Sequence, residues 1–307
     1  MMKVSFIVPA YKAKFLKKAI ESILAQSFSD FELIIVDDAS PENIRQIVSG
    51  FDDARISYFR NEHNIGETSL VKQWNHCLQY AKGEYLILAA DDDLYAPRFL
   101  EQCLALAEKY PQVDVIRSGV EQIDENDSLI GIDGVLPQYC SKYQYVYYWK
   151  NATVFTCMGN YMFKTEALKK KRFIEFPFAF GSDIASTIDM AENGMANTEE
   201  MLFKFRISSI HLSSNKGYLK QKLEAITMLF TWLKNLNYTE PNNPIDKFCY
   251  HHIQWSCLYP KCKYDYYNLV IKNLGFSDLN QINKCTLLTP KDRYGMILRY
   301  IRDKFLK

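Results

Sequence analysis

The sequence has no long apolar run. No uninterrupted stretch approaches the ~18 residues that a membrane-spanning helix needs. Met1-Met2-Lys3 leads directly into a strand-like segment broken by Pro9, which is too short for the core of a secretory signal. We therefore expect neither a secretory signal nor a spanning segment in these 307 residues.

An excess of one charge is also missing. Lysine and arginine together number 37 and acids 36, for a net charge of +1, which argues against a protein whose main task is to grip nucleic acid. Hydrophobic residues make up 48% and charged residues 24%, the ordinary composition of a globular protein. The length predicts about two domains.

The eight cysteines show no pair with the short spacing of a zinc site. Cys77 and Cys103 fall on the apolar faces of predicted helices, where a reduced cysteine acts as a small hydrophobic residue. This usage predicts a reducing, cytoplasmic setting.

Strand and helix patterns alternate along the first part of the chain. Short apolar strands are predicted at 4–8, 31–36, 56–59 and 85–89, and helical spacing appears in 15–24, 70–81 and 97–107. Four strands alternating with helices predict an α/β fold, with a mainly parallel sheet covered on both faces.

The pattern loosens beyond about residue 112. We predict strands at 113–123 and 201–207, a helix at 182–193, and strand or helix at 139–149. From 217 onward the pattern is helical. The predicted organisation is one domain over 1–216, with a nucleotide-binding half (1–110) and an acceptor half (111–216), followed by a C-terminal helical region (217–307).

Notable residues follow three of the predicted strands: Pro9-Ala10-Tyr11, Asp37-Asp38 and Asp91-Asp92-Asp93. Ligands of an open parallel sheet bind beyond the carboxyl ends of its strands. Adjacent carboxylates repel one another unless water or a cation compensates, and Mg²⁺ or Mn²⁺ typically binds one or two carboxylates together with substrate phosphates. The alternative for Asp91-Asp92-Asp93 is a solvated acidic turn before the helix at Pro97.

These segments resemble family 2 glycosyltransferases with the GT-A fold, and the resemblance runs from about Lys3 to Asn215. It is carried by several ordered motifs rather than by any one of them. They are Val4 to Tyr11, Phe31 to Ser40, Asn64-Ile65-Gly66, Asn75, Ala81 to Tyr85, Gly159 to Phe163, and Gly181-Ser182-Asp183. The resemblance implies a Rossmann-like GT-A core and the transfer of a sugar from a nucleotide-diphosphate sugar to a glycan or lipid-linked hydroxyl, in the manner of bacterial cell-surface polysaccharide enzymes.

The metal motif departs from the family pattern. Family members often carry Asp-x-Asp-Asp with a proline four positions later, and anchoring on Pro97 places Ala90 where the first aspartate would stand. Asp91 and Asp93 also form a literal Asp-x-Asp pair, which would point the same way in an extended segment. We expect Asp92 and Asp93 to bind Mn²⁺ or Mg²⁺, with Asp92 the principal ligand and Asp91 near the ribose or metal.

The resemblance also assigns the remaining site residues. It implies that Asp38 or Asp37 accepts a hydrogen bond from the base; the alternative is that both acids cap the next helix. The other residues implied near the nucleotide are Pro9, Ala10, Tyr11, Asn64, Gly66 and Asp91. Gly159 and Asn160 are expected on the acceptor side.

Asp183 is the expected catalytic base. Family 2 enzymes invert the anomeric centre, so a carboxylate must take the proton of the attacking hydroxyl. The alternative role of Asp183 is a stabilising charge at a helix start. His211 is a weaker metal candidate, because the family's Tyr-Arg-x-His pattern is broken at Phe205 to Ser208, and a structural role is favoured.

Two other functions compete with glycosyl transfer. A sugar-phosphate nucleotidyltransferase shares a similar core, but it carries a glycine-rich loop after the first strand, and 9–14 contain no glycine. A catalytically inactive nucleotide- or carbohydrate-binding protein is the second alternative, suggested by Ala90 and opposed by Asp92, Asp93 and Asp183.

The last segment forms a basic amphipathic helix, with Ile297, Leu298, Ile301 and Phe305 on one stripe. We expect this helix to pack on the protein body. Peripheral contact with the inner face of a membrane is the alternative.

Overall fold

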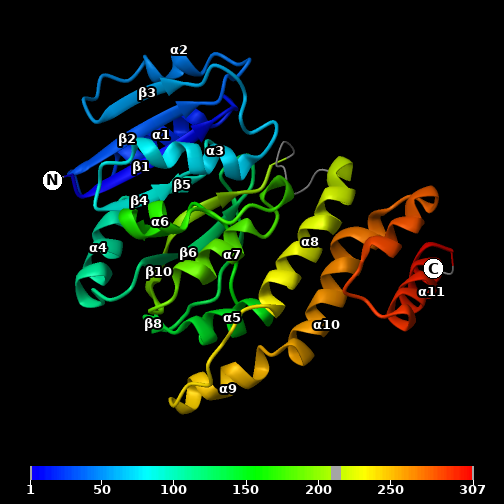
Figure 1. The fold of residues 1–307 in the computed structure, drawn as a ribbon. Coiled ribbons are helices and arrows are strands. Elements are labelled where there is room, and N and C mark those ends of the chain that lie inside the picture. The colour runs from blue at the N-terminus through cyan, green and yellow to red at the C-terminus, as the bar shows by residue number, and fades with distance from the viewer. Residues whose placement is uncertain (1, 209–215, 306–307) are drawn as a thin grey trace.

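The computed structural model describes residues 2–208 and 216–305, which form a mixed sheet with helices on both faces and a helical C-terminal part extending to one side (Figure 1). The strands are β1 (Val4–Ala10), β2 (Phe31–Asp37), β3 (Ile56–Arg60), β4 (Tyr85–Leu88), β5 (Leu94–Tyr95), β6 (Val115–Ile123), β7 (Leu129–Ile132), β8 (Tyr139–Cys140), β9 (Tyr161–Lys164) and β10 (Met195–Arg206). The α-helices are α1 (Leu16–Leu24), α2 (Ile44–Val48), α3 (Leu70–Cys77), α4 (Phe99–Lys109), α5 (Lys142–Lys150), α6 (Thr165–Lys171), α7 (Ser182–Met190), α8 (Leu219–Lys234), α9 (Pro244–His252), α10 (Trp255–Asp265) and α11 (Pro290–Phe305).

The sheet runs in the order β3-β2-β1-β4-β9-β6-β10-β5, with β7 beside β6 and β8 beside β10. Strands β3, β2, β1 and β4 are parallel, while β9 runs antiparallel to both β4 and β6. All seven residues of β2 are buried, as expected for a parallel strand covered on both faces. The predicted α/β fold is confirmed.

Two hydrophobic cores lie on the two faces of the sheet. Helices α1, α2 and α4 pack on one face, and α3, α5 and α7 pack on the other. The second core continues into the C-terminal helices through residues such as Leu229 and Phe230 of α8 and Tyr266 after α10. The helical region after 217 therefore shares a core with the sheet, and the proposed division at 216 stays a prediction.

Local structure differs from the prediction in the later half. Strand β10 begins at Met195, six residues before the predicted start, because its first part pairs with β6 and β8. The ambiguous segment 139–149 is mostly helix, and Ser141 caps α5 by accepting a hydrogen bond from the amide of Gln144.

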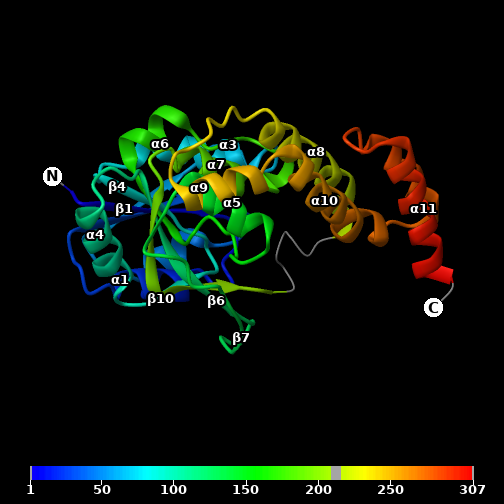
Figure 2. The same cartoon turned by 90° about the horizontal axis from the view of Figure 1, so that it is seen from below.

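Helix α11 lies at the far end of the molecule from the sheet (Figure 2). It packs on the protein body, as predicted, but through Met296 and Tyr300, which are buried. Leu298 and Ile301 of the predicted packing stripe are instead 50% and 37% exposed, and Ile297 is half-buried. That part of the prediction is wrong because two apolar faces share this helix.

Candidate active site

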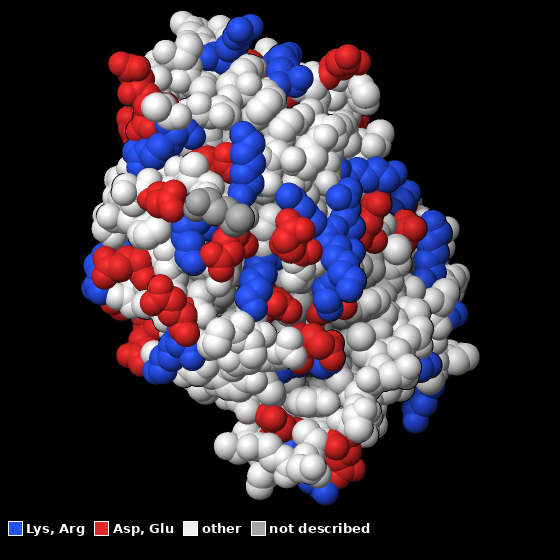
Figure 3. Space-filling model, turned by 60° about the vertical axis from the view of Figure 1, so that its left-hand side comes forward, with Lys and Arg blue, Asp and Glu red and all other residues white. Residues whose placement is uncertain are grey.

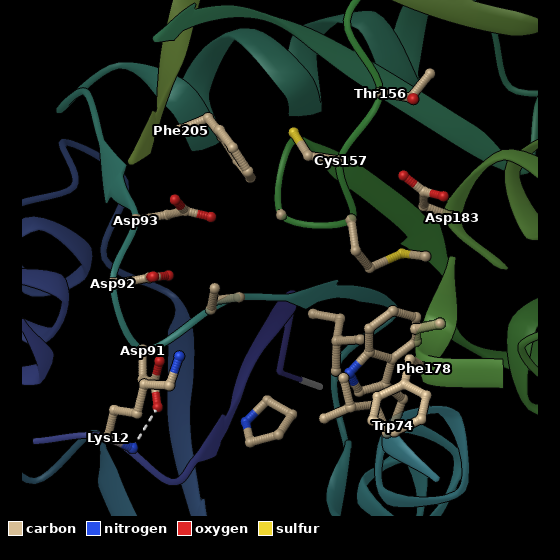
Figure 4. Close-up of a pocket in the computed structure, with 18 of the residues that line it drawn as sticks. Lys12, Trp74, Asp91, Asp92, Asp93, Thr156, Cys157, Phe178, Asp183 and Phe205 are labelled. Atoms are coloured by element: carbon tan, nitrogen blue, oxygen red, sulfur yellow. Dashed lines mark hydrogen bonds between the residues drawn. The ribbon is translucent and has the colours of Figure 1, made fainter. Parts of the chain in front are cut away.

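The loops after β1 and β4 meet at one edge of the sheet. One oxygen of Asp91, Oδ2, accepts hydrogen bonds from the backbone amides of Tyr11 (2.9 Å) and Lys12 (2.8 Å), as Figure 4 shows for Lys12. Asp91 therefore ties the Pro9-Ala10-Tyr11 loop to the turn formed by Asp91-Asp92-Asp93, which we call the carboxylate turn. Pro9 and Asp91 line a cavity of about 290 Å³ at this edge.

Asp92 and Asp93 also line this cavity, and Figure 4 shows both side chains directed into it while Asp91 lies against Lys12. The strict alternation of an extended segment, which would pair Asp91 with Asp93, is not followed because the strand has already ended. Asp93 is only 2% exposed, and its Oδ1 accepts a hydrogen bond from the amide of Arg206 (2.8 Å).

Burial is the main cause of the raised pKa values of the three neighbouring acids. Burial, followed by the charge of Asp92, raises the pKa of Asp91 to about 6. Burial raises the pKa of Asp92 against the opposing effect of Lys12 and Arg206, and burial together with Asp92 raises the pKa of Asp93 well above its ordinary value. A cation near these carboxylates would relieve the repulsion.

Arg206, at the end of β10, holds the carboxylate turn in place. Its Nε donates to the carbonyl oxygen of Asp92 (2.7 Å), and its Nη1 donates to the carbonyl oxygen of Asp124 (2.9 Å) and forms an ion pair with Asp127 (2.6 Å). The guanidinium also lies 4.3 Å from the ring centre of Phe15. No sequence pattern assigned a role to Arg206, although it stands in the broken Tyr-Arg-x-His pattern at the end of a β-type run.

Asp37 closes the end of β2. Its Oδ1 accepts from the amide of Ser40 (2.8 Å), and its Oδ2 accepts from the hydroxyl of Tyr58 (2.6 Å) and pairs with Arg60. The Asp37 carboxylate is fully buried. It holds β2, β3 and the following loop together.

Asp38 organises the loop that contains Asn64 and Gly66. Its carboxylate accepts from the side-chain amide of Asn61 (2.7 Å) and from the backbone amides of Ile65 (2.9 Å) and Gly66 (2.7 Å). A Cβ at Gly66 would stand 2.8 Å from Asp38 Oδ2, so this approach needs glycine. Asn64 in turn accepts from the amide of Glu67 (2.8 Å). Base recognition by Asp37 or Asp38 stays a prediction.

Asp183 lies across the cavity from the carboxylate turn, in the first turn of α7 (Figure 4). Gly181, which has a φ of 82°, precedes it and places the helix start beside the cavity. Burial raises the pKa of Asp183 to about 6, while the amide of Ile184 donates to its Oδ1 (2.9 Å) and opposes that rise. A carboxylate with this pKa is suited to accept a proton near neutral pH.

The two residues expected on the acceptor side, Gly159 and Asn160, differ in their position relative to the cavity. Gly159 lines the cavity, and a Cβ there would come within 2.6 Å of the ring of Phe203. The side chain of Asn160 is fully buried, and its Nδ2 donates to the carbonyl oxygen of Ser118 (2.7 Å). This amide ties the residue before β9 to β6. Acceptor contact at Gly159 and Asn160 stays a prediction.

Several cavity-lining residues escaped the sequence analysis because they come from separate segments. They include Lys12, Trp74, Thr156, Cys157, Phe178, Phe180 and Phe205. No group of three or more histidine, cysteine or acidic side chains forms a metal site in 2–208 and 216–305, and His211 lies outside the residues that the structure describes.

The comparisons with known proteins agree on one family. The pattern of "Glycosyl transferase family 2" matches residues 5–171, more than half of the chain. The chain is 31% identical over 242 residues to the glycosyltransferase MJ1057 of Methanocaldococcus jannaschii, covering 76% of this chain and 80% of that protein. It is 38% identical over 128 residues to EpsE of Bacillus subtilis, covering 40% of this chain and 45% of EpsE, less than half of that relative's length.

A third relative has a more specific name. This is UDP-Glc:alpha-D-GlcNAc-diphosphoundecaprenol beta-1,3-glucosyltransferase WfgD of Escherichia coli, 28% identical over 217 residues that cover 69% of this chain and 80% of WfgD. Among solved structures, S. aureus TarS in complex with UDP-GlcNAc shares the fold, with a TM-score of 0.72 and 19% identity over 92% of this chain and 79% of that one. The motifs, the fold and these matches establish that the chain belongs to glycosyl transferase family 2.

Proposed function

We propose that this protein is an inverting glycosyltransferase. It moves a sugar from a nucleotide-diphosphate sugar to a hydroxyl of a glycan or lipid-linked acceptor, in cell-surface polysaccharide synthesis. The observation that carries the proposal is one cavity with the carboxylate turn on one wall and Asp183 on the opposite wall. The donor and the diphosphoundecaprenol-linked acceptor in WfgD's name support this class of substrates.

Each residue group has one task in this proposal. Pro9, Ala10, Tyr11 and the turn acids Asp37 and Asp38, with Asn64 and Gly66, shape the nucleotide site, and Asp91 fixes the loop beside it. Asp183 accepts the proton of the acceptor hydroxyl as its oxygen attacks the anomeric carbon. The bond from that carbon to the diphosphate breaks, the configuration inverts, and the nucleoside diphosphate leaves with the bonding electrons.

A divalent ion, Mn²⁺ or Mg²⁺, fits the carboxylate turn. Asp92 and Asp93 would hold it, together with the donor diphosphate, and this matches the usual set of one or two carboxylates plus phosphates. The raised pKa values of Asp92 and Asp93 support this assignment, because burial, and for Asp93 also the charge of Asp92, disfavours the charged carboxylates and a bound cation would stabilise them. When bound, the ion would offset the charge that develops on the departing diphosphate. A mannosyltransferase of Pyrobaculum calidifontis with a similar fold (TM-score 0.54, 14% identity) was solved with GDP-Man and Mn²⁺.

Calorimetry tests the donor site. UDP, GDP and dTDP are titrated with Mg²⁺, with Mn²⁺ and with a chelator, using wild type and Asp92→Ala. We expect one nucleotide to bind only with metal and Asp92→Ala to weaken it strongly. Asp52→Ala removes an exposed acid elsewhere and should bind as wild type does. Equal affinity with and without metal would exclude the assignment of the metal to this turn.

We also propose that the enzyme works at the cytoplasmic face of a membrane, held through α11. The exposed Tyr294, Leu298 and Ile301 are spaced i, i+4 and i+7 on one side of this helix, opposite the buried Met296 and Tyr300. Within the described residues no helix is both long and apolar enough to span a bilayer, so α11 would lie in the interface.

The distribution of charge along the chain supports membrane contact through α11. Residues 217–307 contain 14 lysines and arginines against seven acids, whereas 1–216 contain 23 against 29. The side of the sheet domain shown in Figure 3 has both signs interspersed. In α11 the acids are engaged inward: Asp292 accepts from Tyr259, and Asp303 accepts from Tyr267. The basic C-terminal region therefore suits an anionic lipid surface.

Vesicle co-sedimentation tests this contact. The full chain should bind vesicles of phosphatidylcholine with about one third phosphatidylglycerol, and binding should weaken with salt, since charge attraction is screened. Leu298→Glu with Ile301→Glu should release it, while Ile245→Glu, a change at an exposed isoleucine on α9, should not. Equal binding by both variants would reject α11 as the contact.

A further inference from the structure

Aromatic side chains form the side of the cavity next to Asp183. Trp74 of α3 and Phe178 and Phe180 of the loop before α7 line the cavity, and Figure 4 shows the rings of Trp74 and Phe178 together below Asp183. We call these three residues the aromatic wall. They lie across from the carboxylate turn, which is the part of the cavity assigned to the diphosphate.

The loop that carries the wall has an uncommon backbone. Phe178 has φ 53° and ψ 27°, and Ala179 has φ 58°, so two successive residues with side chains occupy the left-handed region. Such conformations persist only when the surrounding structure enforces them, and they cluster at ligand sites. Here the strained backbone keeps Phe178 at the cavity.

The C-terminal region supports this loop from behind. The ring of Tyr218 lies 4.2 Å from that of Phe178, centre to centre, and the ammonium of Lys222 lies 4.9 Å from the ring centre of Phe180. Gly181 approaches α8 so closely that a Cβ would stand 2.9 Å from Leu229. On the other side of the wall, Trp74 packs edge-on against Phe173 (5.7 Å).

We propose that the aromatic wall holds the pyranose ring of the acceptor, with its attacking hydroxyl toward Asp183, and that α8 sets the position of the wall. Ring faces carry negative charge density and attract the weakly positive C–H face of a sugar. Phe178 and Phe180 of the wall share one short segment with Asp183, residues 178–183, so a ring seated on Phe178 lies beside the proton acceptor rather than beside the diphosphate. This inference rests on the proposed function and specifies its acceptor as a sugar.

Saturation-transfer NMR tests the wall with simple probes. Methyl β-D-glucopyranoside, methyl β-D-galactopyranoside and methyl N-acetyl-β-D-glucosaminide are each added to the full chain with Mg²⁺ and the nucleotide found by calorimetry. In wild type at least one glycoside should receive saturation on the C–H protons of one ring face. Phe178→Ala and Trp74→Ala should weaken its binding about two- to tenfold, the range expected for a lost ring contact.

Matched variants separate ring contact from general damage. Trp74→Phe keeps a ring and should restore most of the binding, while Phe59→Ala changes a 38% exposed ring on β3 and should leave it unaltered. Tyr218→Ala removes only the support behind Phe178 and should weaken the glycoside less than Phe178→Ala does. Melting temperatures of all variants show whether each one folds.

Three results would overturn the wall. The first is that the wild type binds no glycoside, and the second is that Phe178→Ala and Trp74→Ala both bind it as the wild type does. The third is that the variants lose affinity only for the nucleotide sugar, which would make the wall a donor-sugar site. The proposed function fails separately, since its failure is the absence of metal-dependent nucleotide binding in wild type. Nucleotide affinity should stay within about twofold of wild type in both wall variants, because their rings are not at the diphosphate.

Discussion

The two walls of the cavity are built in different ways. The carboxylate turn is held by hydrogen bonds from neighbouring strand ends: Asp91 accepts from the amides after β1, and Arg206 donates to the carbonyl of Asp92. The opposite wall is a loop with left-handed residues that rests on the apolar side of α8. The first wall is thus fixed by the sheet, while the position of the second depends on contacts with a distant part of the chain.

The largest expected effect separates catalysis from donor binding. Asp183→Asn keeps the shape of the side chain but removes its proton-accepting charge, so transfer should fall by about 10²–10⁴-fold. Nucleotide affinity should stay within a few-fold of wild type, because the carboxylate turn is on the other wall. Single-turnover rates with the true acceptor and calorimetry measure the two quantities. Near-normal turnover would exclude Asp183 as the catalytic base.

The pH dependence of sugar transfer should report the ionisation of Asp183. With a pKa of about 6, Asp183 is a carboxylate above pH 6 and a neutral acid below it. The rate of the chemical step should therefore fall about tenfold for each pH unit below 6, since only the ionised form accepts a proton. Rapid-quench rates between pH 4.5 and 8 measure this limb. A profile that stays flat through pH 6 would contradict the assignment.

Asp183 should also reduce stability at neutral pH. Its pKa is about 6 in the folded protein against an ordinary 3.8, so the folded state binds the proton more tightly. The contribution of Asp183 to stability therefore falls as pH rises from about 4 through 6, and Asp183→Asn lacks this contribution, whereas the raised pKa of Asp91 acts in both proteins. Above pH 7 this variant should be more stable by about 1–3 kcal/mol. Denaturant unfolding at pH 4 and pH 8 measures the difference, which should be small at pH 4.

Gly181→Ala tests the dependence of the loop on α8. The new Cβ would stand 2.9 Å from Leu229, and the alanine would have to adopt a φ of 82°. The free energy of unfolding should therefore fall by about 1–2 kcal/mol. Gly275→Ala is the control, because its Cβ has no neighbour closer than 3.8 Å and its φ is negative. Chemical denaturation compares the two variants, and equal stability would show that the loop tolerates displacement.

The smallest effect is a gain in stability. Ala179→Gly relieves the backbone strain of one left-handed residue and removes only a methyl group. It should raise the free energy of unfolding by about 0.5–1 kcal/mol. Thermal melts with Ala152→Gly, the same change at another left-handed alanine, serve as comparison. A loss of stability at Ala179 alone would mean that its methyl group is needed for packing.

The first wall could be predicted from local sequence patterns. The apolar run at 85–89 followed by three acids predicts a carboxylate turn at a strand end, and parallel strands bring their carboxyl ends to one edge. The loop at Pro9, the acids after β2 and the turn at Asp91 therefore had to lie near one another. The helix start at Ser182 was equally local, because Gly181 and the apolar spacing that follows it mark the beginning of a helix.

Only the tertiary structure decided the rest, because those properties come from contacts between segments far apart in the chain. The side-chain amide of Asn160 donates to the carbonyl oxygen of Ser118 on β6, and Arg206 contacts a turn more than 100 residues earlier in the chain. In α11 the face with Met296 and Tyr300 was buried, whereas Leu298 and Ile301 of the stripe that periodicity marked were left exposed. The aromatic wall joins Trp74 to Phe178 and rests on α8, and no local pattern encodes such a meeting, since packing against distant neighbours selects it.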